Sequence, residues 1–156
     1  MKACSFLFFL LFSTSSCTNT NITDTSAKVG ESAELLAETI CFQRLTGSAN
    51  QDTSFVRMVI SDGEVTGNFM HLPYEKDSRK GTITGTKQGD IIKGIWLYMQ
   101  EGMHDTLSVE FKLNGNTLLQ KNYSVNLETG RQFLSDTSRF EMEYRKIDCS
   151  RFSSHL

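Results

Sequence analysis

Three short turn sequences recur at equal intervals along the chain, and each is followed by a segment in which apolar and polar residues alternate. They read "SDGEVTG", "KQGDIIKG" and "KLNGNTLL", and their glycines, Gly63, Gly89 and Gly115, are each 26 residues apart. Asp-Gly and Asn-Gly pairs favour the tight turns that join antiparallel strands. Because two strands and their connections fill such an interval, the sequence predicts a series of β-hairpins.

The segment "DTLSVEFKL" shows the alternation most clearly, with leucine, valine and phenylalanine on one face and polar residues on the other. Glycines inside two predicted strands, Gly67 and Gly94, indicate the bends that a strongly curved sheet needs. Residues 31–39 carry a helical pattern, and residues 125–138 form either a loop or one short strand. The predicted strands lie near 40–46, 54–60, 64–72, 80–87, 91–99, 105–113, 116–124 and 139–147.

Eight or nine antiparallel strands in a short chain must avoid exposed sheet edges, and closure into a barrel removes them. The predicted fold is therefore all-β, an antiparallel up-and-down meander that closes into a barrel of eight to nine strands, with one short N-terminal helix. A two-sheet sandwich is the alternative. In a closed barrel the first and last strands are neighbours, which would bring Cys41 close to Cys149.

The first seventeen residues have the features of an export signal. Lys2 precedes the apolar run 3–12, which is too short to cross a bilayer as a helix. The small residues that follow end at Cys17 and resemble the lipobox of bacterial lipoproteins, in which a diacylglyceryl group is added to the cysteine sulfur. Thr14 stands where the lipobox usually has leucine. The alternative is a secreted protein cut near Ser15, with Cys17 as a loop thiol.

The number of cysteines favours lipidation. Cys4 lies in the signal, which leaves Cys17, Cys41 and Cys149 in an exported protein. Because an unpaired thiol is a liability outside the cell, we expect a lipid on Cys17 and a disulfide between Cys41 and Cys149. The predicted organisation is a signal peptide (1–16), a lipid-anchored polar tether with the short helix (17–38), a β-barrel domain (39–150) and a disordered tail (151–156).

Charge and motifs argue against several function classes. The formal net charge is −2, and the acidic and basic residues are scattered, so the sequence predicts no nucleic-acid partner. The segment "GTITGTK" has three residues between its glycines where a P-loop has four, and it lies in a predicted strand. Neither a G-x-S-x-G elbow nor a C-x-x-C pair is present. The sequence predicts no cofactor and no enzymatic activity.

Several of these features together resemble one family. Cys17, the polar stretch after it, Cys41, "GTITGTKQGDIIKGIWLYMQEGM", "VEFKLNGNTL" and the closing Cys149 are similar to small cell-envelope lipoproteins of Bacteroidota. The resemblance covers about residues 40 to 149 and rests on the spacing of strands and turns. It implies a barrel of lipocalin-like or avidin-like shape and a lipid-anchored position in the bacterial cell envelope. Most such proteins have no assigned activity, so the resemblance implies no chemistry.

Aromatic residues on the predicted strands are the first candidates for a binding site. Phe69, Trp96, Tyr98 and Phe111 either line a ligand cavity or fill the core, because an eight-stranded barrel is just wide enough for its own side chains or one small ligand. The segment "HLPYEKDSRK" is either a recognition loop that presents Tyr74 or a solvated connection between strands.

The segment "EGMHD" is the second candidate. Glu101, His104 and Asp105 would need a further ligand such as His71 or Glu75 to bind zinc or copper. The alternative is an ordinary polar turn.

The sequence as a whole predicts a non-enzymatic envelope lipoprotein whose barrel binds a small apolar molecule or an envelope protein. A structural or accessory subunit of a larger envelope complex is the second hypothesis. A metal-handling protein or hydrolase that uses Glu101, His104 and Asp105 is the third.

Overall fold

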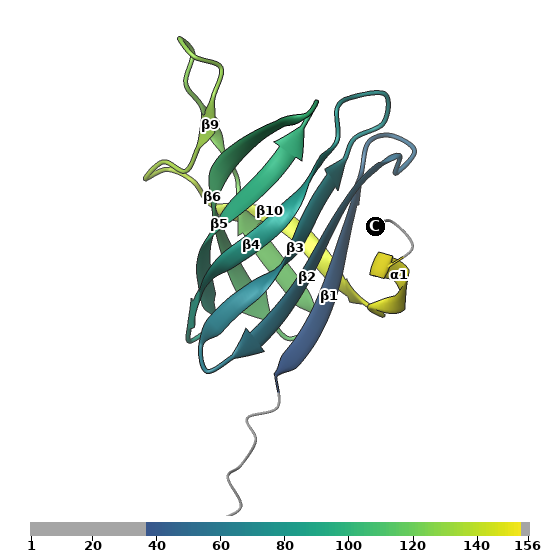
Figure 1. Cartoon of the computed structure of the whole chain (residues 1–156), viewed down its shortest axis with the longest axis vertical. Helices are drawn as coiled ribbons and strands as arrows, with labels where there is room; N and C mark the ends of the chain where they lie inside the picture. Colours follow the sequence, from purple (N-terminus) through teal and green to yellow (C-terminus); the bar gives the residue numbers. More distant parts are fainter. Residues whose placement is uncertain (1–36, 154–156) are drawn as a thin grey trace, which may run out of the picture. The chain divides into compact units, whose positions relative to one another are not determined.

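A computed structural model describes residues 37–153, which form a closed antiparallel β-barrel with a small hairpin and a short helix attached to it (Figure 1). The signal peptide, Cys17 and most of the tether predicted from the sequence lie outside these residues. The barrel strands are β1 (Glu38–Thr46), β2 (Asp52–Ser61), β3 (Glu64–Leu72), β4 (Arg79–Gln88), β5 (Ile91–Gln100), β6 (Met103–Asn114), β7 (Thr117–Lys121) and β10 (Phe140–Ile147).

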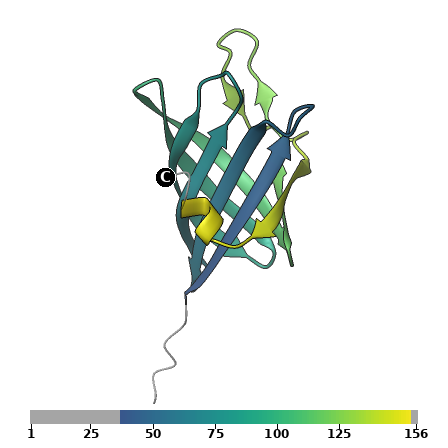
Figure 2. The same ribbon diagram turned by 90° about the vertical axis from the view of Figure 1, so that its right-hand side faces the viewer.

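Successive strands are neighbours around the barrel, and β10 lies between β7 and β1 to close it. The predicted all-β barrel is confirmed, with eight strands in the closed sheet, and the sandwich alternative is wrong. The uncertain stretch between β7 and β10 forms a small hairpin of β8 (Ser124–Val125) and β9 (Gln132–Phe133). This hairpin projects beyond one end of the barrel (Figures 1 and 2).

Two details differ from the sequence-based expectations. Residues 38 and 39 begin β1, so the helical stretch predicted over 31–39 does not reach its expected end, and residues 31–36 lie outside the description. The predicted disordered tail instead starts with the helix α1 (Ser150–Ser153), in which Phe152 is fully buried. Among residues 37–153, no helix combines the length and apolar character needed to cross a membrane.

The predicted turn glycines occupy the positions that need them. Gly63, Gly89 and Gly115 have φ angles of 78°, 59° and 57°, a region that favours glycine because it has no Cβ. Inside β3, a Cβ on Gly67 would overlap the backbone carbonyl of Arg57 on β2, so β2 and β3 approach each other closely at Gly67.

One end of the barrel is filled with apolar side chains. Phe42, Met58, Ile83, Ile92 and Leu118 are fully buried inside it and belong to one continuous core. Burial of this kind is the main stabilising contribution in a small domain. The filled end is the one at which β1 begins, so the chain enters the barrel at its closed end.

A second apolar cluster lies on the outer face of the barrel. Phe152 of α1 packs there against Phe55, Met70 and Cys41, and Figure 2 shows α1 lying over this side of the sheet. A disulfide joins Cys41 on β1 to Cys149 after β10, as predicted. It fastens the strand pair that closes the barrel, whose ladder has three aligned residue pairs against nine between β1 and β2.

Candidate functional site

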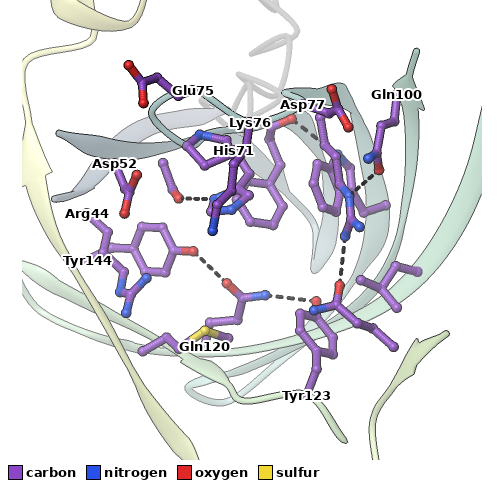
Figure 3. Close-up of a pocket in the computed structure, with 18 residues that line it drawn as sticks. Arg44, Asp52, His71, Glu75, Lys76, Asp77, Gln100, Gln120, Tyr123 and Tyr144 are labelled. Carbon is purple, nitrogen blue, oxygen red and sulfur yellow. Dashed lines mark hydrogen bonds between the residues drawn. The ribbon is translucent and has the colours of Figure 1, made fainter. Parts of the chain in front are cut away.

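The end of the barrel opposite the apolar core is hollow. The cavity has a volume of about 650 Å³ and opens between the β3–β4 loop and the ends of β1 and β2. Pockets for small molecules usually measure roughly 300 to 1,000 Å³. Figure 3 shows the cavity with polar side chains around its wall.

Four of these side chains lie in one row across four neighbouring strands. Arg44 on β1 is aligned with Ser54 on β2, Ser54 with His71 on β3, and His71 with Arg79 on β4. Each points into the barrel, and the next inward residues towards the filled end are apolar on β1, β2 and β3, namely Phe42, Val56 and Phe69. The row is therefore a polar belt that replaces the apolar core near the mouth.

Three further residues form a hydrogen-bonded chain across the opposite wall (Figure 3). The hydroxyl of Tyr144 donates to Gln120 Oε1 at 2.6 Å, and Gln120 Nε2 donates to the hydroxyl of Tyr123 at 2.8 Å. Burial raises the pKa of both tyrosines, so their hydroxyls remain protonated. Gln120, which is almost fully buried, has its carbonyl oxygen and one N–H satisfied, as a buried amide requires.

Arg79 links the cavity to the β8–β9 hairpin. Its Nε donates to Gln100 Oε1 at 2.6 Å, and its Nη1 donates to Gln132 Oε1 on β9 at 2.7 Å. The guanidinium also lies over the ring of Tyr98, 5.1 Å from the ring centre. These acceptors are neutral amides, so the positive charge of Arg79 has no carboxylate partner among the described residues.

His71 occupies the centre of the belt. Its Nδ1 lies 2.8 Å from Ser54 Oγ. Partial burial lowers the pKa of His71, and the positive charges of Arg79 and Arg44 lower it further, while Asp52 acts in the opposite direction. At neutral pH the imidazole is therefore uncharged.

Aromatic rings form the floor of the cavity. The rings of Phe69 and Trp96 lie 4.2 Å apart, and Trp96 Nε1 donates to the carbonyl oxygen of Phe69 at 3.2 Å. Both residues line the cavity. Of the other two aromatic candidates, Phe111 is fully buried in the core, and Tyr98 lines an adjoining hollow of about 190 Å³ beside β9.

The β3–β4 loop forms one side of the mouth. Asp52 Oδ1 accepts a hydrogen bond of 2.8 Å from the backbone N–H of Tyr74, which ties the loop to the start of β2. Glu75, Lys76 and Asp77 face the opening and are exposed. Tyr74 is itself exposed, so the segment is solvated and also borders the cavity.

The residues proposed for a metal site are not brought together. His104 is exposed on β6, whereas Asp105 is bound by the guanidinium of Arg131 at 2.6 Å. Glu101 lies in the β5–β6 turn with a φ of 49°, and His71 is in the belt of the cavity. Within residues 37–153, no group of three potential ligands is placed to hold a metal ion.

Sequence reasoning missed several cavity residues, namely Arg44, Ser54, Arg79, Gln120 and Tyr144. A signal for three of them was present, because Arg44, Ser54 and Gln120 each fall on the apolar face of an alternating strand. All of the interrupted faces reach the same end of the barrel. A polar residue at an inward position there predicts a cavity wall in place of packed core.

The fold and the cavity define an eight-stranded barrel with one filled end and one open, polar end. A scan against protein-family models finds no match, and searches of curated proteins and of solved structures find no significant match either.

Proposed function

We propose that this protein is an exported, lipid-anchored binding module that holds a small molecule in the open end of its barrel. The observation that carries the proposal is the cavity of about 650 Å³, which combines an aromatic floor with a wall of polar side chains. Such a combination is typical of small-molecule sites, in which apolar area supplies affinity and a few polar groups fix orientation.

The position of the chain's entry into the barrel supports an anchored arrangement. β1 begins at the closed end, and the cavity opens at the other end. A tether from Cys17 would therefore join the barrel at its closed end, away from the mouth of the cavity. The Cys41–Cys149 disulfide agrees with export to an oxidising compartment. In this proposal the protein belongs to the bacterial cell envelope, as its resemblance to envelope lipoproteins implies.

Native mass spectrometry of the protein purified from its own cells tests the binding function. We expect a small-molecule adduct that is released on denaturation. Leu107→Trp should remove the adduct, because Leu107 lines the cavity and the larger side chain would fill it. The matched control is Leu97→Trp, on the half-exposed outer face of β5, which should keep the adduct. A wild-type protein with no adduct would contradict the function.

Labelling with radioactive palmitate tests the anchor. The wild-type protein should carry the label and sediment with membranes, whereas Cys17→Ser should lose the label and become soluble. An unlabelled wild-type protein, together with unchanged fractionation of Cys17→Ser, would refute the anchor and leave the binding function to be judged on its own.

A second candidate function, as an accessory subunit of an envelope complex, is supported by the outer face of β5. Ile95, Leu97 and Met99 lie there in a row and are each almost half exposed. The aligned neighbours of Ile95 and Leu97 are uncharged, namely Thr82, Thr84, Thr106 and Ser108, whereas Met99 is aligned with Lys80 and His104. Exposed apolar surface with uncharged neighbours, as around Ile95 and Leu97, suits a docking face. Leu97→Lys should then release a co-purifying envelope protein, while Thr86→Lys, at an exposed position of β4, should retain it.

A further inference from the structure

Arg44 is a cation of the cavity wall that has no hydrogen-bond or ion-pair partner among residues 37–153. Neither a hydrogen bond nor an ion pair joins its guanidinium to another described residue. Every fully buried side-chain nitrogen or oxygen within residues 37–153 has a partner, so the unpaired nitrogens of Arg44 are in contact with solvent. Figure 3 shows Arg44 beside Tyr144 at the edge of the cavity. The guanidinium is therefore free to bind a ligand.

The charges below the mouth leave one positive charge uncompensated. Arg44 and Arg79 contribute two cations and Asp52 one anion, and all three are partly buried. His71 adds no charge at neutral pH because its pKa is lowered. Glu75, Lys76 and Asp77 on the rim sum to one negative charge, but these side chains are exposed, and water and salt screen them. A ligand with a single negative charge would balance the interior.

The part of the cavity below the belt is apolar. Phe69, Trp96 and Leu107 line it and are buried. A ligand that reaches from Arg44 to this floor must therefore carry an apolar body behind its charged group.

We propose that the cavity selects an amphipathic monocarboxylate, whose carboxylate is bound by Arg44 and whose apolar body lies against Phe69 and Trp96. The inference rests on the proposed small-molecule binding function and narrows it to one ligand class. A guanidinium fits a carboxylate with two parallel hydrogen bonds. Ser54 is aligned with Arg44, and His71 is aligned with Ser54, so two further hydrogen-bonding side chains follow Arg44 along the belt.

The test uses three probes that share one apolar body: 4-phenylbutyrate, 4-phenylbutan-1-ol and 4-phenylbutylamine. Trp96 is the single tryptophan of the chain and lies in the cavity floor, so its fluorescence reports binding directly. We expect the full-length wild-type protein to bind the acid at least about tenfold more tightly than the alcohol, and the amine most weakly, since a charge-assisted hydrogen bond contributes at least that factor.

Arg44→Gln should abolish the preference for the acid and leave binding of the alcohol unchanged. Arg145→Gln is the matched control, because Arg145 is exposed on the outside of β10 and pairs with Glu143 at 3.4 Å. It should keep the preference. If Arg44→Gln does not fold, Arg44→Lys replaces it, which retains the charge but loses the two-pronged geometry, and should lower the preference.

The outcomes separate this inference from the proposed function. Equal or tighter binding of the alcohol by the wild-type protein overturns the carboxylate inference and leaves the binding function intact. Loss of the acid preference in Arg145→Gln also overturns it. If none of the probes binds, the inference fails, and the native adduct measurement alone decides whether the cavity holds a ligand of another class.

Discussion

At the scale of single residues, His71 makes the stability of the barrel depend on pH. Its pKa is lowered from 6.5, chiefly by burial and then by Arg79 and Arg44, with Asp52 opposing them. The unfolded chain therefore takes up a proton at His71 at a higher pH than the folded chain does. The stability that neutral His71 contributes is fully present above about pH 6.5, and it is lost as the pH falls through the lowered pKa that His71 has in the folded protein.

Urea unfolding between about pH 7.5 and about pH 5.5 checks this prediction. We expect the midpoint of the wild-type protein to fall over this range, and His71→Gln to show a smaller fall. The expected change in the unfolding free energy is a fraction of roughly 1.4 kcal/mol per pH unit, the value for a group that is protonated only in the unfolded chain, because solvent in the cavity screens His71. His104→Gln, at an exposed position of β6, should behave as wild type. An identical pH profile for wild type and His71→Gln would contradict the prediction.

Tyr144 is the second single residue whose substitution should change the unfolding free energy. Tyr144→Phe keeps the ring but leaves Gln120 Oε1 without its donor at 2.6 Å. Because Gln120 is buried, we expect a loss of about 1 to 3 kcal/mol in the unfolding free energy. Tyr74→Phe, in the exposed loop, should cost almost nothing. Equal midpoints of urea unfolding for the two variants would show that water reaches Gln120 and replaces the lost hydroxyl.

At the scale of single elements, the strands could be predicted because their information is local. Alternation and turn glycines depend on residues close in sequence, and β3 was expected over the residues at which the structure has it. The helix α1 could not be predicted in this way. Its four residues are too few for a helical pattern, and it is held by contacts of Phe152 with strands far away in the sequence.

Gly81 lies where the backbones of β4 and β5 approach each other closely. A Cβ at this position of β4 would overlap the backbone carbonyl of Leu97 on β5, and backbone cannot move aside as a flexible side chain can. Gly81→Ala should therefore lower the unfolding free energy by about 1 to 3 kcal/mol or more, as overpacking does. Thr82→Ala, at the next and exposed position, serves as the control in urea unfolding. A neutral Gly81→Ala would mean that β4 and β5 separate at no cost.

At the scale of the whole molecule, closure of the barrel could be predicted from the sequence, but which end of its interior is filled and which is hollow could not. Closure follows from the number of strands and from the need to avoid free edges. Whether an inward position is filled or open depends on how side chains from all strands fit together at one height of the barrel. Arg44 and Gln120 are remote in sequence, and only the three-dimensional register shows that both border one cavity.

The disulfide should decide how firmly the whole barrel stays closed. Cys41 and Cys149 are separated by 108 residues and join the two ends of the fold. A crosslink over a loop of this length restricts the unfolded chain, and the chain-entropy treatment assigns it about 5 kcal/mol. The double variant Cys41→Ala/Cys149→Ala should therefore unfold at a much lower urea concentration, with α1 released first because Phe152 packs beside Cys41.

Hydrogen exchange of the double variant checks where the barrel opens. The backbone amides of β1 and β10, which share only three aligned pairs, should exchange faster than those of β4 and β5. Adding a reducing agent should shift the wild-type midpoint towards that of the double variant and leave the variant itself unchanged. A wild-type midpoint that does not respond to reduction would mean that packing alone closes the barrel.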